Sequence, residues 1–479
     1  MAANNSGKLW RWGIPLAVFV LIWFWPVPDS LTASAGAVNA GKAWHMLAIF
    51  AATIVGILTS PVPSGVLMIL ALAVCYFTNT LTLGQTLSGF SSGAVWMIWS
   101  AIILGVGFMK SGLGRRIAYY LLSKIGSSTL GVAYALGFAD LVMAPAMPSV
   151  TARSGGIILP IAKAINEVMD SEPGEKGKRI GDFLIMVCFQ FAPITGALFL
   201  TGMAANPLCA TLAKSGLGVD LTWAGWFWAA LVPAMLCFFV MPYAAYKMLD
   251  PTLKKTPEAK EMGAAELAKM GPMTKQEKLV LAGFIGALVG WGSTMWTGLN
   301  ANAIGIALAA YLLVSGALTW NDVLGEKSAW DTVVWFSAII ALAGGLTKLG
   351  FITWMVAGFA AGVSGVSWFV AFLVLGFAYI YLHYAFATAT GHVAAMYVPF
   401  GAVAIGAGAP PMMVAICFGI FTNFMWSITE YAGGPGPVYF STGYFSRPRF
   451  YRINFILVTL NIIIVFASGM LWWKAIGLY

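Results

Sequence analysis

Two short motifs of the same pattern lie in the middle of two long apolar stretches. Each motif places a hydroxyl residue two positions before a threonine and a basic side chain two positions after it. The residues are Ser149, Thr151 and Arg153 in the first motif, and Thr388, Thr390 and His392 in the second. Hydroxyl groups donate hydrogen bonds to carboxylate oxygens, and a helix that starts at such a break offers free backbone N–H groups. The pair of motifs therefore predicts a binding site for small carboxylate anions.

The basic residue of each motif is its most informative member. A charged arginine at membrane depth costs roughly 2.5 kcal/mol or more, and such residues usually mark function. Arg153 could instead be structural, paired for instance with Asp140. His392 alone is typical of a hydrogen-bonded interior histidine, and its register with Arg153 is what singles it out. The hydroxyl residues also have a structural alternative, because Ser and Thr are common where membrane helices pack.

Two loops are expected to complete the site. Each adjoins a predicted span and contains Gly and Pro, which unwind a membrane helix and expose backbone groups. The residues expected to contribute are Asn206 and Pro207 in the first loop, and Gly434 and Pro435 in the second. Two acids at membrane depth, Asp140 and Glu430, could bind a proton or a cation, or pair with a base. The sequence does not choose among these roles.

The motifs belong to a chain that cannot face water. Of its 479 residues 60% are hydrophobic and 9% are charged, whereas a soluble domain carries about a quarter charged residues. Mean hydropathy is +0.85. We expect an all-α polytopic membrane protein with about eleven transmembrane helices. The predicted spans are 12–28, 44–60, 64–78, 94–110, 181–201, 224–247, 279–297, 301–318, 332–346, 411–430 and 453–473.

The two stretches that hold the motifs, 128–165 and 366–401, are too long for one crossing. Small, hydroxyl and Pro residues interrupt each of them midway. We interpret both as re-entrant hairpins, which enter and leave the membrane on the same side. Broken backbone of this kind is tolerated only where protein or a water-filled cavity satisfies it.

The distribution of positive charge orients the chain. Of the 26 Lys and Arg residues, 21 fall in predicted cytoplasmic segments and four in external ones, and the remaining one is Arg153. The N-terminus, with Lys8 and Arg11, is therefore expected in the cytoplasm and the C-terminus outside, across a cell inner membrane. The same distribution accounts for the net charge of +9 without any nucleic-acid partner.

The chain also has the pattern of a duplication. Thr82 matches Thr319 at an offset of 237 residues, Gly112 matches Gly350 at 238, and the two hydroxyl motifs match at 239. Chance matching of common membrane residues is the alternative, but three blocks keep this slowly drifting register. Each unit has five crossings and one hairpin. Since five is odd, the second unit is inverted, as is typical of secondary transporters. The predicted segments are 1–43 (N-terminus and first span), 44–250 (first repeat), 251–278 (cytoplasmic linker) and 279–479 (second repeat).

The segments around these motifs resemble a known family. The run from Pro148 to Ile157 is similar to the first signature of the divalent anion/sodium symporter (DASS) family. The exchanger branch of that family contains citrate/succinate and tartrate/succinate antiporters and plastid 2-oxoglutarate/malate translocators. Four segments of this chain resemble that branch, namely Trp320–Leu324, Ala329–Asp331, Gly434–Tyr439 and the ending Trp472–Lys474. The resemblance covers nearly the whole chain. It implies a homodimer in which a transport domain moves as an elevator against a fixed scaffold.

The resemblance also implies roles for the hairpin tips. In the family a Ser-Asn-Thr signature binds sodium and the substrate carboxylates. The matching triplets here are Ser149, Val150 and Thr151, and Thr388, Ala389 and Thr390. Asn is missing from both, which argues against sodium coupling. Arg153 and protonated His392 would then offset the substrate charge of about −2, which a low-dielectric site cannot hold uncompensated. An empty carrier would hold unbalanced positive charge, which predicts obligatory exchange.

The predicted function is exchange of di- or tricarboxylates, with succinate, malate, 2-oxoglutarate, citrate and tartrate as candidates. A sodium- or proton-coupled symporter that uses Asp140 or Glu430 is the alternative, and a membrane enzyme or a channel is a remote one. The five cysteines show neither CxxC pairing nor metal-ligand spacing, so no cofactor, metal or catalytic residue is expected. The expected partners are carboxylate anions, the lipid bilayer and a second copy of the chain.

Overall fold

The structure, a computed structural model, describes residues 9–362, 365 and 367–479. Lys8 and Val366, which belong to the predicted N-terminal segment and the second predicted hairpin, lie outside the described residues. Within the described part the chain is helical, and its β-type pairing is one isolated antiparallel bridge between Ser128 and Lys255. The expectation of an all-α polytopic membrane protein is confirmed.

The helices fall into two series with one helix between them. The first series is α1 Leu9–Phe24, α2 Asp29–Ala35, α3 Ala37–Thr59, α4 Ser64–Phe77, α5 Leu83–Thr86, α6 Gly93–Ser111, α7 Leu113–Ile125, α8 Thr129–Met143, α9 Leu159–Val168, α10 Gly181–Leu198, α11 Ala205–Leu212 and α12 Trp223–Leu249. The helix between the series is α13 Pro257–Met270. The second series is α14 Lys275–Thr297, α15 Ala301–Val314, α16 Trp320–Gly325, α17 Lys327–Lys348, α18 Phe351–Gly362, α19 Trp368–Tyr381, α20 Ala389–Gly406, α21 Pro411–Met425, α22 Pro435–Phe440 and α23 Arg447–Ala475. Short helical turns of 3-10 or π type are η2 Ser88–Ser91, η3 Ala144–Ala146, η4 Thr151–Ile158, η5 Glu175–Lys178, η6 Ala213–Leu217, η7 Leu382–Ala385 and η8 Trp426–Ile428.

Eleven helices among the described residues are long and apolar enough to cross a membrane. The number agrees with the prediction, but the set differs. Two predicted spans, in α4 and α15, are helices of only 14 residues, about 21 Å long against a hydrocarbon core of about 30 Å. The predicted first span, in α1, pairs with α2 at a bend of 73°. Their places in the eleven are taken by α8, α19 and α20, which belong to the predicted hairpins.

The two series run in the same order, so that α3 to α12 correspond one by one to α14 to α23. The correspondence extends to local chemistry. Thr82 starts α5 and Thr319 starts α16, and each forms a capping box with the residue three positions on. In a capping box two side chains satisfy two free N–H groups reciprocally, which sets where a helix begins. The duplication seen in the sequence is therefore repeated in the order and the capping of the helices.

Both predicted hairpins consist of two helical arms joined by a short non-helical break. In the first, α8 and η3 lead to the break at residues 147–149, and η4 and α9 follow. In the second, α19 and η7 lead to the break at residues 386–388, and α20 follows. Pro148 in the first break has no N–H to continue a helix. Thr388 caps α20 through its side chain. The breaks carry the hydroxyl motifs.

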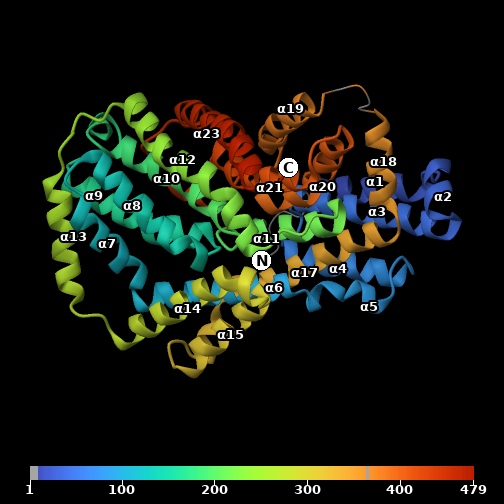
Figure 1. The fold of residues 1–479 in the computed structure, drawn as a ribbon, viewed down its shortest axis with the longest axis horizontal. Helices are drawn as coiled ribbons and strands as arrows, with labels where there is room; N and C mark the ends of the chain where they lie inside the picture. Colours follow the sequence, from blue (N-terminus) through green and yellow to red (C-terminus); the bar gives the residue numbers. More distant parts are fainter. Residues whose placement is uncertain (1–8, 363–364, 366) are drawn as a thin grey trace.

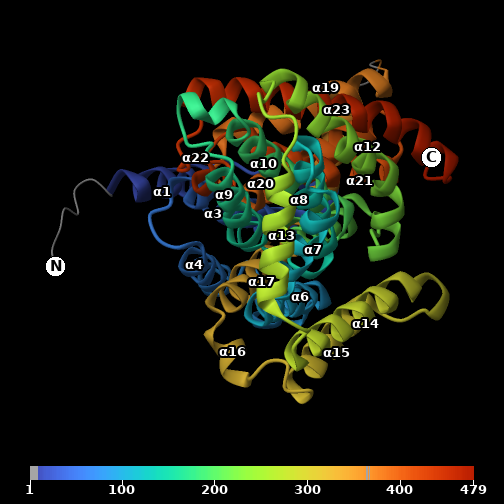
Figure 2. The same ribbon diagram turned by 90° about the vertical axis from the view of Figure 1, so that its left-hand side faces the viewer.

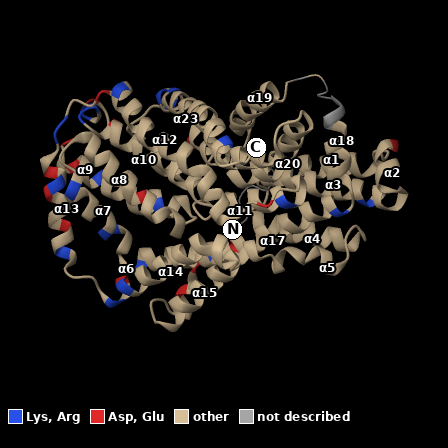
Figure 3. Ribbon diagram, viewed as in Figure 1, with Lys and Arg blue, Asp and Glu red and all other residues tan. Residues whose placement is uncertain are grey.

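The breaks are held around a buried centre. All residues of α10 are buried, and α10 packs against α8, α12 and α21. Figure 1 shows α20 and α21 of the second series beside α11 of the first. Figure 2 shows the α14–α15 pair extending away from the remaining helices. Charged side chains gather at the end formed by α7, α9 and α13 (Figure 3), which identifies that end as one that faces water.

A close approach between α8 and α10 requires glycine at position 137. A Cβ at Gly137 would overlap the ring of Phe191, which is itself packed 4.8 Å from the ring of Phe238. We expect Gly137→Ala to destabilise the protein by about 1–3 kcal/mol, because the ring has no free space to enter. A drop in the apparent melting temperature of purified protein measures the effect.

Gly344→Ala is the matched control for that measurement. Gly344 lies inside α17, and apart from its chain neighbours and the adjacent backbone of its own helix, no heavy atom lies within 4 Å of the point where its Cβ would lie. Alanine restricts the unfolded chain more than glycine does, so this change should leave the melting temperature unchanged or raise it. Equal effects of the two substitutions would contradict the assigned contact.

Candidate functional site

A cavity of about 220 Å³ lies where both hairpin breaks meet the two Gly- and Pro-containing loops. Eight of the twelve residues singled out in the sequence line it, namely Ser149, Val150, Thr151, Thr388, Ala389, Thr390, Gly434 and Pro435. It is also lined by Pro148, Met203, Ala204, Ala205, Ala387, Trp426 and Gly433. Residues more than 200 positions apart are thus brought to one cavity by the fold.

The two hydroxyl motifs begin helices that start at this cavity. The Ser149 hydroxyl accepts a hydrogen bond from the Ala152 N–H at 3.4 Å, and the Thr388 hydroxyl accepts one from the Gly391 N–H at 3.1 Å. Both hydroxyls keep their own proton to donate. Within the described residues, the hydroxyls of Thr151 and Thr390 form no hydrogen bond. Two helix starts and four hydroxyl groups at one cavity suit an anion with several oxygen atoms.

The loop that follows η8 forms one wall of the cavity and touches the opposite hairpin. A Cβ at Gly434 would overlap the hydroxyl of Thr151, and one at Gly433 would overlap the ring of Trp426. Glycine at these two positions therefore lets backbone approach side chains that a larger residue would displace. The second half of the chain closes directly on the first half at the cavity.

Arg153 is fully buried beside the cavity and does not line it. Its Nε donates to the Asp140 carboxylate at 3.0 Å. Its Nη1 donates to the carbonyls of Met147 and Gly202 at 2.7 and 2.9 Å, and its Nη2 donates to the Ala192 carbonyl and the Thr195 hydroxyl at 3.3 and 3.2 Å. Thr195 in turn donates to the second oxygen of Asp140. The guanidinium ties the first hairpin break to the loop after α10.

This ion pair changes the charge of the site from what the sequence led us to expect. The expected role of Arg153 was to offset substrate charge, with unbalanced positive charge left in an empty carrier. Because Asp140 balances the guanidinium, the pair carries no net charge in this structure. Arg153 thus forms the ion pair with Asp140 that was considered as the alternative to a role in substrate binding. A charge that Asp140 balances gives no reason for obligatory exchange.

His392 is also fully buried beside the cavity, on α20. Its Nδ1 lies 3.1 Å from Nδ1 of His383, a residue to which the sequence assigned no role. The other ring nitrogen of His383, Nε2, lies 3.0 Å from the carbonyl oxygen of Ala432. The contact depends on how the loop closes on the hairpin, and no motif in the sequence pointed to it.

Asn206 and Pro207 support the first loop and do not line the cavity. The Asn206 side-chain amide donates to the carbonyls of Gly196 and Phe199, both at 2.9 Å, and its oxygen accepts from Asn423 at 2.8 Å. It thereby satisfies carbonyls at the end of α10. Pro207 lines a different cavity, together with Lys214 and Asp220.

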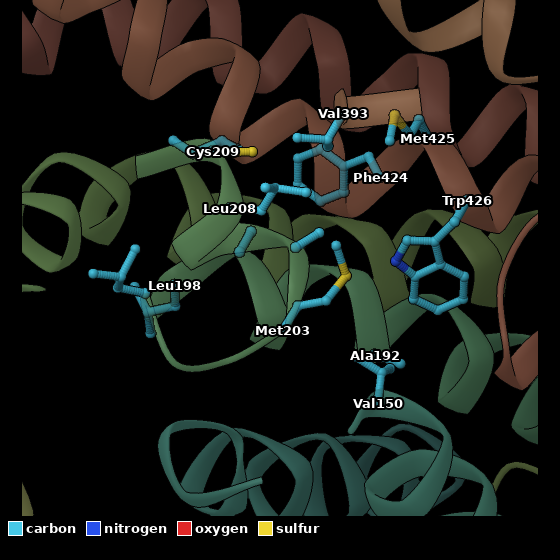
Figure 4. Packing of buried hydrophobic residues seen from close by; sticks show 14 of the residues in the cluster. Val150, Ala192, Leu198, Met203, Leu208, Cys209, Val393, Phe424, Met425 and Trp426 are labelled. Atoms are coloured by element: carbon cyan, nitrogen blue, oxygen red, sulfur yellow. The ribbon is translucent and has the colours of Figure 1, made fainter. Parts of the chain in front are cut away.

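Sequence reasoning missed Met203 and Trp426, two large side chains of the cavity wall. Figure 4 shows them side by side, with the indole nitrogen of Trp426 on the side of the Met203 thioether. The Trp426 ring also packs edge-on against Phe189, with ring centroids 5.6 Å apart. Apolar residues are so common in this chain that no pattern distinguished these two.

Glu430, the second acid considered in the sequence, pairs with Arg447 at 2.7 Å and does not line the cavity. Both intramembrane acids thus have a basic partner. Among the described residues, no group of three His, Cys, Asp or Glu side chains could hold a metal ion. A larger cavity, of about 310 Å³, lies between α3, α17, α18 and α20, but its lining is almost entirely hydrocarbon and offers little to an anion.

Comparison with known proteins agrees with the resemblance seen in the motifs. Residues 6–479 match the family model described as "Sodium:sulfate symporter transmembrane region". The putative malate transporter YflS of Bacillus subtilis is 43% identical over 467 residues, 97% of this chain and 96% of that protein. The chloroplastic dicarboxylate transporter 1 of Spinacia oleracea is 39% identical over 463 residues, 96% of this chain and 80% of that protein.

A solved structure extends the comparison to the fold. MtrF of Neisseria gonorrhoeae, which illustrates a class of antimetabolite efflux pumps, superposes on this chain with a TM-score of 0.57. The match covers 91% of this chain and 97% of that one at 15% sequence identity. The likeness shows a shared membrane-protein architecture and nothing about substrate.

The buried ion pair makes a prediction that separates charge from shape. Arg153→Met should destabilise the protein by about 3–5 kcal/mol, because it leaves the Asp140 carboxylate buried without a partner. The double variant Arg153→Met/Asp140→Leu removes both charges and should regain a large part of that loss. Apparent melting temperatures of the two variants and the parent chain test this. If the single variant has the same apparent melting temperature as the parent protein, the ion pair does not stabilise the hairpin.

Proposed function

The chain belongs to the family of the sodium:sulfate symporter transmembrane region, and from this premise we propose that it exchanges small dicarboxylates across the cell inner membrane without sodium. The observation that carries the proposal is the cavity, to which two matched hairpin breaks each bring two hydroxyl groups and a helix start. Relatives that match nearly its whole length are named as malate or dicarboxylate transporters. Enzymatic activity is not part of the proposal, because the named relatives are transporters.

Two matched half-sites fit a substrate with two carboxylates. The first break contributes Ser149 and Thr151, and the second contributes Thr388 and Thr390. Each half-site can donate two hydroxyl hydrogen bonds and lies at the positive end of a helix dipole. A dicarboxylate such as malate, succinate or 2-oxoglutarate offers one carboxylate to each half. Tartrate carries the same pair of groups, and citrate carries them with a third carboxylate, so both stay among the candidate substrates.

Three carbonyl oxygens beside the cavity already have protein partners. The carbonyls of Met147 and Gly202 accept from the Arg153 guanidinium, and the carbonyl of Ala432 contacts His383. Hard cations need several oxygen ligands at short distance, and these oxygens are already engaged. The absence of Asn from both triplets removes two further amide ligands. Both facts support transport that does not depend on sodium.

Exchange is a mode that the membrane potential does not oppose. Moving one charge across the membrane involves about 2.3 kcal/mol per 100 mV, so net entry of a dianion alone opposes an inside-negative potential by about twice that amount. Exchange of one dianion for another moves no net charge. Because the Arg153–Asp140 pair is neutral, it adds no charge to either direction of the cycle.

The proposed movement follows from the duplicated architecture. We infer that the second series of helices is inverted in the membrane relative to the first, and that a transport domain with both hairpins moves as an elevator in a homodimer. The charged end at α7, α9 and α13 is assigned to the cytoplasm (Figure 3), with the N-terminus inside and the C-terminus outside. This assignment keeps the orientation that the positive charges of the sequence predict.

Counterflow in proteoliposomes tests the function directly. Vesicles loaded with unlabelled malate should take up labelled external malate rapidly, and replacing sodium by choline should change the rate by less than about twofold. Vesicles without internal dicarboxylate should take up almost none. Uptake into empty vesicles that depends on sodium or on an inward proton gradient would overturn the proposal in favour of a symporter.

The hydroxyl groups of the hairpin tips provide a second test. Thr151→Val and Thr390→Val keep the shape of the side chain and remove one donor each, so each should raise the KM of exchange about 5- to 20-fold. The maximal rate should change less, because the loss is in substrate binding. Thr211→Val serves as control, since the Thr211 hydroxyl is outside this cavity and donates to the Pro207 carbonyl. Unchanged KM in both tip variants would remove the hydroxyls from the site.

A further inference from the structure

His383 connects the second hairpin to the loop that closes the cavity. It lies in η7, at the end of the first arm of that hairpin, and is fully buried. Its Nε2 lies 3.0 Å from the carbonyl oxygen of Ala432. Ala432 immediately precedes Gly433 and Gly434, two residues of the cavity wall. This hydrogen bond joins the hairpin to the wall, together with a second one in which the Tyr431 hydroxyl of the loop donates to the Tyr384 carbonyl at 2.7 Å.

The first half of the chain contains a matching contact. Arg153 donates to the carbonyl of Gly202 at 2.9 Å. Gly202 is the fourth residue after α10 ends at Leu198, and Ala432 is the fourth residue after η8 ends at Ile428. In each half, a nitrogen of the hairpin holds the same position of the unwound loop. The sequence motifs align Arg153 with His392. In the structure, however, the contact that matches the one made by Arg153 is made by His383.

We propose that His383 is the positioning residue of the second half-site, and that it holds the loop at residues 429–434 in the shape that binds the substrate. The proposal rests on the proposed dicarboxylate exchange. His392 orients His383 through the contact between their Nδ1 atoms, which lie 3.1 Å apart. His383 acts through the loop and does not line the cavity itself.

The hydrogen bonds of the two histidines assign their protons. A carbonyl oxygen can only accept, so His383 carries its proton on Nε2. Neutral His383 then has a free lone pair on Nδ1, and His392 must donate to it from its own Nδ1. The remaining nitrogen of His392, Nε2, is a buried acceptor without a partner among the described residues. His392 is thus committed to orienting His383, which in turn is committed to the loop.

The His383–Ala432 contact affects the shape of the cavity because the loop at residues 429–434 is closely packed. Gly434 presses against the Thr151 hydroxyl, and Gly433 presses against the Trp426 ring. If His383 is lost, the Ala432 carbonyl is left buried without this donor, and the loop must move to satisfy it. Movement at Ala432 displaces the next two residues, which form the wall. Substrate binding should weaken, while the rate of the loaded carrier is affected less.

A pair of substitutions at position 383 separates this role from simple packing. His383→Leu fills the space without a donor, whereas His383→Gln places an amide N–H close to the position of Nε2. In malate counterflow we expect His383→Leu to raise KM about tenfold or more with a maximal rate within about threefold of the parent protein. His383→Gln should return KM to within about threefold of the parent value.

Matched variants control the experiment. His45→Leu changes the remaining histidine of the chain, which stacks on Trp23 with ring centroids 3.7 Å apart and is outside the cavity. It should leave KM unchanged. His392→Asn keeps a donor near the position of Nδ1, and His392→Leu does not. KM should therefore rise more in the Leu variant than in the Asn variant. Size-exclusion profiles in detergent establish which variants fold.

The outcomes are distinguishable. If the parent protein and His45→Leu show no counterflow, the proposed function fails and the role of His383 fails with it. If both exchange normally but His383→Leu keeps the parent KM, or His383→Gln is as impaired as a folded His383→Leu, the positioning role alone is overturned. Should His383→Leu not fold, His383→Gln decides: a KM within about threefold supports the role, and a tenfold rise overturns it.

Discussion

Backbone that leaves the helix inside a bilayer has no water to satisfy its carbonyls, and this requirement organises the centre of the molecule. Four of the carbonyls at or beside the breaks have a side-chain partner. Arg153 donates to Gly202, Asn206 donates to two carbonyls at the end of α10, and His383 contacts the carbonyl of Ala432. The polar residues buried around the cavity are explained mainly by this need. With the backbone satisfied, the hydroxyl groups at the hairpin tips remain available for a ligand.

Charge is balanced within the protein before any substrate arrives. Arg153 is neutralised by Asp140, and Glu430 pairs with Arg447. In the proposed site, the groups that would hold an anion are hydroxyl groups and helix dipoles, which act over short distances. Such a site suits a carrier, because binding through these groups can be strong enough to select a substrate and weak enough to release it. A bare lysine or arginine in the cavity would hold a carboxylate more firmly.

The two halves of the chain interlock at the site. Gly434 of the second half meets the Thr151 hydroxyl of the first, and Gly433 lies on the ring of Trp426. These contacts leave no room for a Cβ, so the glycines are needed for packing as well as for unwinding the loop. A substitution that moves the first hairpin at Thr151 therefore also moves the loop of the second half at Gly434. Residues of both halves therefore line the same cavity.

Composition and spacing were sufficient for the membrane fold and for the helix breaks at Ser149 and Thr388, because hydropathy and repeated motifs can be read from the order of the residues alone. The set of long helices was less accessible, because α4 and α15 have only 14 residues each and hydropathy alone does not fix which apolar segments form long helices. The sequence offered Asp140 as one possible partner of Arg153, but the contacts that form could not be decided from it. Asp140 neutralises Arg153, and His383 rather than His392 contacts the loop, because the packing of α10 and the closure of residues 429–434 bring distant groups together. Hydrogen bonds between distant segments exist only in the folded chain.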